Sequence, residues 1–194
     1  YEGVFLCADM FQKEVWTFRG LRTAYVFFVL HLQTRRVLFT NATFSPTNDW
    51  LKQQARPVFW ECEDLGIAPR FFLRDNDVLY PDDMDMILKS SCVDTVKTPY
   101  QAPNANSHSE RYVLSCKTDC MDHLLIFGLG HLQYVLDSYT EYFNSHRPHQ
   151  GINNKIPDEY NKKSKVGSKI SFKPAMVARK DFLGGLLKSY RRAA

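Results

Sequence analysis

The sequence predicts an α/β fold. Short, strongly apolar runs of β-forming residues are interspersed with longer segments of helical composition. Two of the apolar runs are separated by only a short polar joint, Leu32-Gln33-Thr34-Arg35, which favours an antiparallel hairpin. Hydrophobic residues make up 44% of the 194-residue chain, which is enough for a packed core.

Five segments are predicted as strands. Residues 3–11 are too apolar for a sheet that is exposed on one side, so this strand is expected to be buried. Residues 23–31 and 36–43 are the two arms of the hairpin. Residues 69–75 form a fourth strand that ends in an acid, and residues 92–97 form a short fifth strand.

The first predicted helix covers residues 50–65. The residues Ser45-Pro46-Thr47-Asn48 are helix-start signals, and Gly66 ends the helix. Pro57 lies inside it, where a proline removes a hydrogen bond and clashes with the preceding turn at a cost of about 3 kcal/mol. We therefore expect a kink or two helices. A short helix is expected over residues 81–91, with Asp82, Asp83 and Asp85 as solvated acids of its first turn.

Two helices are predicted in the second half of the chain. No Pro or Gly occurs between Asn104 and Phe127, which indicates one long helix with Glu110 in its first turns. Gly128 and Gly130 separate it from a helix over residues 131–144. The apolar residues of this second helix recur at helical spacing, and we interpret them as core packing.

Three acids stand out as candidate site residues. Asp9 lies within an apolar strand, where a carboxylate costs several kcal/mol unless it is paired, protonated or metal-bound. Asp75 comes at the carboxyl end of a strand, the edge where ligands gather in α/β sheets. Glu110 follows a stiff polar loop with two prolines. For Asp9 alone, a strand-end cap or an arginine pair is the preferred explanation of the acid, and Asp77 is an alternative to Asp75.

Four stretches carry a resemblance to a known family. They are Cys7-Ala8-Asp9, Arg74-Asp75-Asn76-Asp77, the loop from Thr98 to Arg111, and Tyr142-Phe143-Asn144-Ser145-His146-Arg147-Pro148-His149-Gln150-Gly151. This order of motifs, together with the spacing from Asp75 to Glu110, resembles the integrase-core transposases, the DDE-type insertion-sequence enzymes related to retroviral integrases. The resemblance covers roughly residues 1–158 and, more loosely, the tail.

The resemblance implies a ribonuclease-H-like fold, with a five-stranded mixed sheet flanked by helices and a basic C-terminal extension. It implies an integrase catalytic core over residues 1–160 and a basic linker and tail over residues 161–194. In this family the active site is formed by two Asp and one Glu. The matching residues here are Asp9, Asp75 and Glu110. Asp77 fits the family spacing less well, because it lies closer to Glu110 than Asp75 does.

The resemblance also implies metal-dependent DNA strand cleavage and strand transfer during recombination. Three neighbouring carboxylates repel one another, and two Mg²⁺ ions, for which Mn²⁺ could substitute, would relieve this repulsion. One alternative is a catalytically inactive DNA-binding or assembly module derived from a transposase. Another is a ribonuclease-H-like nuclease acting on RNA–DNA hybrids, although such enzymes lack the Pro-Tyr-Gln-Ala-Pro-Asn loop.

The expected partners are the DNA ends of a mobile element, target DNA and further copies of the chain. Relatives place basic residues along the helix that follows the Glu. Here Leu114, Ser115 and Thr118 occupy much of that position, which leaves Arg111 and Lys117 as its DNA-binding candidates. The extension carries ten Lys or Arg and one Asp, a net charge of +9. A total of +4 therefore leaves −5 on the rest of the chain. A basic extension on an acidic body suits phosphate contacts.

The remaining residues set expectations about environment. The five cysteines form no disulfide framework, and we interpret them as buried free thiols in a reducing compartment, the bacterial cytosol, in preference to a metal pair at Cys116 and Cys120. His146 and His149 are interpreted as part of a capping loop and not as metal ligands. No apolar run reaches the roughly 18 residues of a membrane span. Because the sequence begins without Met inside an apparent strand, we expect it to be part of a longer protein.

Overall fold

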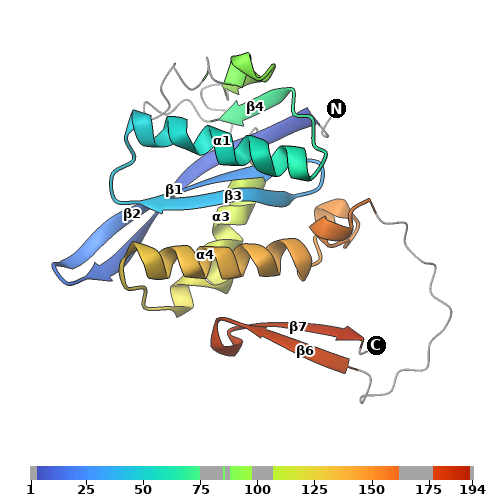
Figure 1. Ribbon diagram of the computed structural model, residues 1–194. Helices are drawn as coiled ribbons and strands as arrows, with labels where there is room; N and C mark the ends of the chain where they lie inside the picture. Colours follow the sequence, from blue (N-terminus) through green and yellow to red (C-terminus); the bar gives the residue numbers. More distant parts are fainter. Residues whose placement is uncertain (1–3, 75–84, 86–87, 98–106, 162–176, 193–194) are drawn as a thin grey trace.

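The centre of the fold is a mixed sheet with the strand order β3-β2-β1-β4-β5 (Figure 1). The computed structural model describes residues 4–74, 85, 88–97, 107–161 and 177–192. Its strands are β1 (Phe5–Thr17), β2 (Gly20–His31), β3 (Arg36–Thr43), β4 (Phe71–Arg74), β5 (Asp94–Lys97), β6 (Val177–Phe182) and β7 (Leu187–Arg192). Its α-helices are α1 (Asn48–Asp64), α3 (Ser107–Asp119) and α4 (Gly128–Ser145).

The pairing of the strands confirms the predicted five-stranded mixed sheet. Strands β1, β2 and β3 are antiparallel, whereas β4 and β5 run parallel to β1. The hairpin predicted over residues 23–43 is the β2–β3 pair. Strands β1 and β2 form a second hairpin, which was not predicted because the first strand was expected to end at Phe11, whereas β1 continues to Thr17. In this extension the side chains alternate between the two faces of the strand: Val15 is buried, while Gln12 and Glu14 are exposed.

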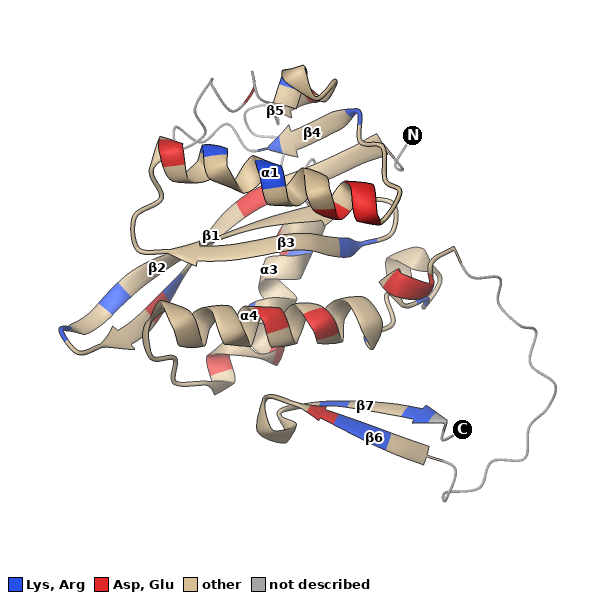
Figure 2. Ribbon diagram, in the orientation of Figure 1, with Lys and Arg blue, Asp and Glu red and all other residues tan. Residues whose placement is uncertain are grey.

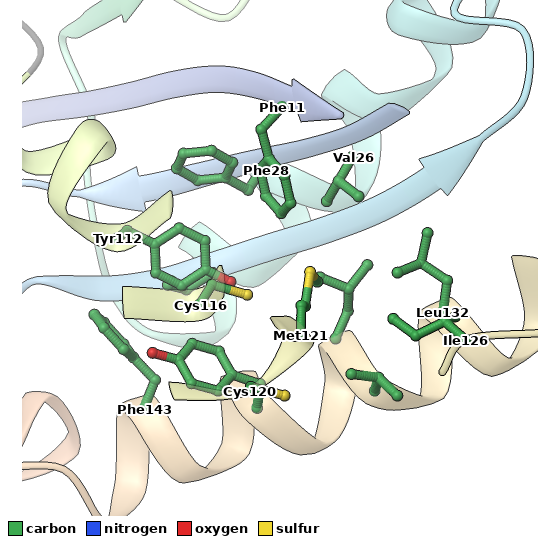
Figure 3. Packing of buried hydrophobic residues seen from close by; sticks show 14 of the residues in the cluster. Phe11, Val26, Phe28, Tyr112, Cys116, Cys120, Met121, Ile126, Leu132 and Phe143 are labelled. Carbon is green, nitrogen blue, oxygen red and sulfur yellow. The ribbon is translucent and has the colours of Figure 1, made fainter. Parts of the chain in front are cut away.

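Two hydrophobic clusters lie on opposite faces of the sheet. One joins the sheet to α3 and α4 through Phe11, Phe28, Tyr112, Tyr139 and other buried side chains (Figure 3). The other joins the sheet to α1 and includes Leu6, Phe27 and Leu51. Consecutive residues of β1 and β2 thus point to opposite cores, which explains why the central strands are almost uniformly apolar.

Helix α1 is one continuous helix and not two, although Pro57 lies inside it. It begins where the start signals predicted, because the Thr47 hydroxyl accepts a hydrogen bond from Trp50 N at 3.2 Å. Gly66 follows its end with a positive φ of 64°, a conformation that glycine adopts without strain. The buried residues Leu51, Ala55, Val58 and Cys62 share one face of α1. This face anchors both halves of the helix to the sheet.

Helix α3 ends at Asp119, so the prediction of one helix reaching Phe127 was wrong. Cys120 leaves the helical conformation with φ −134° and ψ −68°, and a short 3-10 turn, η3 (Met121–His123), follows. Lys13 Nζ donates to Met121 O at 2.9 Å, and Trp16 N donates to Ile126 O at 2.8 Å. These contacts hold the segment against the end of β1. They require a tertiary partner, which no local sequence signal reveals.

Helix α4 confirms the predicted core-packing helix and carries the C-terminal hairpin on its other side. Leu132, Val135, Leu136, Tyr139 and Phe143 of α4 are buried. Strands β6 and β7 form an antiparallel hairpin beside α4 (Figure 1). Its buried residues, Phe182 and Leu187, join the same hydrophobic cluster. The basic segments of the hairpin lie near acidic segments of α4 (Figure 2), and Lys180 Nζ pairs with Glu141 at 2.6 Å.

No α-helix in the described part of the chain is both long and apolar enough to cross a membrane.

Candidate active site

Asp9 lies in the middle of the sheet, on the face that α3 covers. In the β1–β2 ladder it is opposite Phe28. Directly opposed side chains share a face, and the Phe28 ring lies 4.7 Å from the ring of Tyr112 on α3. The Asp9 carboxylate is partly buried, and its Oδ1 accepts a hydrogen bond from Met10 N at 2.7 Å. The carboxylate is therefore directed toward the helix that carries Glu110.

Glu110 lies in the first turn of α3 and is exposed. The residue before it, Ser109, is fully buried, and its Oγ lies 3.0 Å from the Sγ of Cys7 on β1. Cys7 and Asp9 point to the same face of the strand, because side chains repeat every two residues. One buried contact thus connects the strand of Asp9 to the helix turn of Glu110. The aromatic pair Phe28–Tyr112 adds a second connection, typically worth about 0.5–1.5 kcal/mol.

The pKa of the Cys7 thiol reflects this environment. Burial raises the pKa to about 12, the hydrogen bond with Ser109 opposes the rise, and the negative charge of Asp9 adds to it. The thiol therefore stays protonated at neutral pH. A neutral, buried contact of this kind positions the two elements without placing another anion beside Asp9.

Asp75 and Asp77 lie outside the described residues. Strand β4 ends at Arg74, which pairs with Ala8, the residue before Asp9. Arg74 is 1% exposed, and its guanidinium donates twice to Asp85: Nε to Oδ1 at 3.2 Å and Nη2 to Oδ2 at 2.8 Å. Because two guanidinium nitrogens bond the two oxygens of one carboxylate, the orientation of the Arg74 side chain is fixed. The end of β4 is therefore anchored, and Asp85 is an ion-pair partner, not the solvated acid that was predicted.

The two predicted DNA-binding residues lie on different sides of α3. Arg111 is exposed beside Glu110. Lys117 is half-buried, and its Nζ lies 5.5 Å from the ring centroid of Phe11, two residues after Asp9 on the same face of β1. Leu114, at 55% exposure, occupies the helix surface between them. The charge on this helix is therefore sparse, as the sequence predicted.

The end of α4 and the segment after it close the α3 side of the core. Asn144 is buried and bonds both backbone groups of Val37 on β3: Val37 N donates to Oδ1 at 2.9 Å, and Nδ2 donates to Val37 O at 2.8 Å. His146 Nδ1 lies 2.8 Å from Ser189 Oγ on β7, and His149 Nε2 donates to Phe143 O at 3.2 Å. Arg147 bonds Asp119 and, at 3.1 Å, the Tyr139 hydroxyl. These contacts confirm a capping segment.

All five cysteines are free thiols. Four are buried, and Cys92 is exposed. Cys116 and Cys120 lie in the hydrophobic cluster between α3 and α4 (Figure 3). Across the described ranges, no three His, Cys, Asp or Glu side chains are grouped closely enough to hold a metal ion, and Asp75 falls outside those ranges.

The sequence did not predict the contact of Ser109 with Cys7 or the ion pair between Arg74 and Asp85. An arginine at the end of an apolar strand, with several acids in the segment that follows, was a usable signal for the ion pair. Ser109 had no such signal, because a serine in the first turn of a helix resembles any other polar residue there.

Part of the chain matches a known family model. Residues 91–157 match the family model of the integrase core domain, a stretch that includes β5, Glu110, α3, α4 and the capping segment. The matched stretch is shorter than half of the chain, so the similarity to the integrase core domain is shown for that part of it. The predicted resemblance is thereby confirmed. No curated protein sequence matches the chain.

Solved structures show the fold of the chain. A chain from the simian T-cell lymphotropic virus intasome in complex with PP2A regulatory subunit B56 gamma superposes with a TM-score of 0.63 at 12% identity. That match covers 97% of this chain and 66% of the other, so this chain spans just under two thirds of the viral one. The HTLV-2 integrase catalytic core domain, solved with magnesium, has a TM-score of 0.56 at 10% identity. That match covers 81% of this chain and 95% of the HTLV-2 chain.

The BIV integrase catalytic core domain gives a TM-score of 0.54 at 10% identity, covering 81% of this chain and 92% of its own. Identities this low show the shared architecture alone. The predicted ribonuclease-H-like fold is confirmed.

Proposed function

We propose that this chain contains the catalytic core of a DNA transposase that performs metal-dependent strand cleavage and strand transfer. The observation that carries the proposal is the buried Cys7–Ser109 contact, which joins β1, the strand of Asp9, to the first turn of α3, where Glu110 lies. A family match alone leaves open whether the site is intact. The contact supports the proposal because it constrains the two acids that the resemblance assigns to the site.

The third proposed ligand is Asp75. It directly follows Arg74, whose register partner Ala8 directly precedes Asp9. In a parallel pair the two chains leave the sheet in the same direction, about 5 Å apart. The ion pair of Arg74 with Asp85 anchors the end of β4 from which Asp75 continues.

The donor set suits magnesium. Asp9 and Glu110 supply hard carboxylate oxygens, the ligands that Mg²⁺ prefers. Asp9, Asp75 and Glu110 would hold the ions, and bound Mg²⁺ would supply Lewis-acid stabilisation of the attacking and leaving oxygens. Partial burial of Asp9 limits its access to bulk water, and exposure of Glu110 leaves one side of the site open to a large substrate such as duplex DNA. Arg111 and Lys117 would contact its phosphates.

The protein is proposed to act as a homo-oligomer on mobile-element ends and target DNA, in the bacterial cytosol. The HTLV-2 core has been solved in dimeric and trimeric forms, and the simian viral relative forms an intasome. The buried free thiols agree with a reducing compartment. Residues 1–160 are proposed as the core and residues 161–194 as the basic extension.

The deciding experiment is calorimetric titration of Mg²⁺ and Mn²⁺ into the wild-type chain and into Asp9→Asn, Asp75→Asn, Asp77→Asn and Glu110→Gln. Glu14→Gln is the matched control, because Glu14 is an exposed acid on the same strand. We expect binding in the wild type, Asp77→Asn and Glu14→Gln, and loss in the other three. Retained binding in Glu110→Gln would reject the assigned site, and loss in Asp77→Asn with binding retained in Asp75→Asn would move the second carboxylate to Asp77.

Activity is then measured as Mn²⁺-dependent nicking and joining of plasmid DNA. Metal binding without either activity would favour the inactive DNA-binding or assembly module. Cleavage confined to an RNA–DNA hybrid would favour the ribonuclease-H-like nuclease.

A further inference from the structure

A cavity of about 560 Å³ lies beside the first two turns of α3, on the same face of the sheet as Asp9. Leu30 of β2 lines it, and in the β1–β2 ladder Leu30 is opposite Cys7. The turn between β2 and β3, the start of α3 and the segment after α4 contribute the other walls. This site is called here the arginine cavity, and its polar side chains include Arg35, Ser107, His108, Arg111, Arg147 and His149.

The charge of the arginine cavity is one-sided. Three arginines line it, and among the described residues of its walls none is an Asp or Glu. Asp119 pairs with Arg147 from behind, which offsets one charge. The start of α3 lies at the same wall, and a helix N-terminus adds partial positive charge and N–H groups.

The cavity is built from side chains that are held in place. Arg147 bonds Asp119 and the Tyr139 hydroxyl, and Tyr139 in turn donates to Ser115 Oγ at 3.1 Å. His149 packs 4.3 Å from the Phe143 ring while its Nε2 donates to the Phe143 carbonyl. Because that carbonyl can only accept, the imidazole orientation is set. The guanidinium of Arg147, held by its two hydrogen-bond partners, loses little conformational freedom when it binds a ligand.

The arginines are also close enough to act together. A Cβ added at Gly151 would lie 3.7 Å from Arg35 Nε, so Arg35 packs along the segment that carries Arg147 and His149. The pKa of His149 is lowered by burial and then by the charges of Arg147 and Arg35. Both guanidinium groups thus act on one imidazole. Planar guanidinium groups that converge on one space match the oxygens of a phosphate group.

We propose that the arginine cavity binds a phosphate group of the DNA backbone next to the catalytic site. Arg111 directly follows Glu110, so a phosphate held here would fix the strand relative to the proposed metal ligands. The assignment to DNA rests on the proposed function, whereas the affinity for a phosphate group does not. The motif from Tyr142 to Gly151 gains a second role: it closes the core and also presents Arg147 and His149 to the ligand.

The test measures binding in EDTA, so that it is independent of metal and of chemistry. Two probes are used: inorganic phosphate, followed by NMR chemical shifts, and a short fluorescent DNA duplex, followed by anisotropy at several salt concentrations. The variants are Arg35→Gln and Arg111→Gln. The matched control is Arg56→Gln, which removes the same charge from the exposed face of α1 on the opposite side of the sheet. Thermal unfolding confirms that each variant is folded.

We expect Arg35→Gln and Arg111→Gln each to weaken the binding of both probes about tenfold, the usual effect of losing a charge-assisted hydrogen bond. Each should also lower the slope of log K against log salt by about 0.9, because one phosphate contact is lost. Arg56→Gln should leave the inorganic phosphate titration unchanged. Equal effects of all three substitutions on both probes would overturn the proposal.

Weakened phosphate binding with unchanged duplex binding would overturn the DNA assignment and indicate a site for a free anion. If the titration shows no metal binding, the phosphate and duplex measurements still stand, because the two experiments share neither probe nor variant. A chain that binds no metal but loses duplex affinity in Arg111→Gln would be an inactive module with a working phosphate site.

Discussion

The individual residues of the site depend on small buried contacts between elements that are distant in the sequence. Ser109 contacts Cys7, and Asn144 bonds Val37, each from the opposite half of the chain. Each polar group buried this way would cost about 1–3 kcal/mol if it lost its partner. Neutral buried contacts of this kind therefore position the strand of Asp9 relative to the helix of Glu110.

His149 provides a pH-dependent test of one such residue. Burial and the charges of Arg147 and Arg35 lower its pKa below the ordinary 6.5. The unfolded chain therefore binds a proton more readily than the folded chain. This contribution to stability is complete above about pH 6.5 and is lost as the pH falls below it. We expect the urea midpoint of the wild type to decrease between pH 7 and pH 5, and to decrease less in His149→Gln, whose amide can still donate to Phe143 O.

His146 serves as the comparison, because its pKa is lowered too, by burial and by Arg191 and Lys180. It also titrates in the wild type, so the informative quantity is the difference between wild type and His149→Gln at each pH. Parallel curves for the two proteins would show that His149 contributes nothing to the acid sensitivity.

Among the secondary-structure elements, α1 and α3 show how packing overrides local signals. Four buried residues hold α1 against the sheet on both sides of Pro57, so the helix continues past a residue that usually breaks it. Helix α3 shows the opposite effect. It ends at Asp119 without a Pro or Gly, because Lys13 and Trp16 of β1 bond the chain that follows.

Pro57→Ala is expected to stabilise the protein by about 2–2.6 kcal/mol. Alanine restores the N–H that can bond the Gln53 carbonyl and removes a clash worth about 3 kcal/mol. The greater freedom of the unfolded chain offsets about 0.4–1 kcal/mol of this gain. Urea unfolding would measure the change, with Gln53→Ala, an exposed substitution in the same helix, as the control. A lower midpoint for Pro57→Ala would mean that the proline ring contributes packing that alanine cannot replace.

For the molecule as a whole, a sheet buried on both faces separates two hydrophobic cores. Burial keeps four of the five thiols away from solvent. It raises the pKa of Cys62 to about 11 and the pKa of Cys120 to about 12, and it raises the pKa of Cys116 well above its ordinary value. Thiol reactivity therefore reports on the integrity of both cores at once, because the thiolate is the reactive form.

We expect one thiol, that of Cys92, to react quickly with Ellman's reagent in the native protein at pH 8, and all five to react in denaturant. Cys92→Ser should abolish the fast phase and leave the slow one unchanged. Fast reaction of two or more thiols in the native chain would show that one of the cores opens readily.

Local signals in the sequence were sufficient to locate the strands of the central sheet, the β2–β3 hairpin, the start of α1 and the packing face of α4. Each depends on contacts within a few residues: alternation, helical spacing, or a cap such as Thr47. The same signals marked Asp9 and Glu110 as unusual carboxylates, and the order of the motifs indicated the integrase core. Asp75 stays a prediction, because it lies outside the residues that the structure describes.

Other features arise only when distant segments pack together: the end of α3, the pairing of Asp85 with Arg74, and the position of the β6–β7 hairpin on α4. Packing also brings Arg35, Arg111 and Arg147, which are far apart in the chain, to the walls of one cavity. The physical reason is the same in each case. The partner atoms come from remote segments, and a contact between such segments leaves no periodic or compositional trace in either one. Local sequence rules describe the elements, and the packing of those elements creates the candidate site.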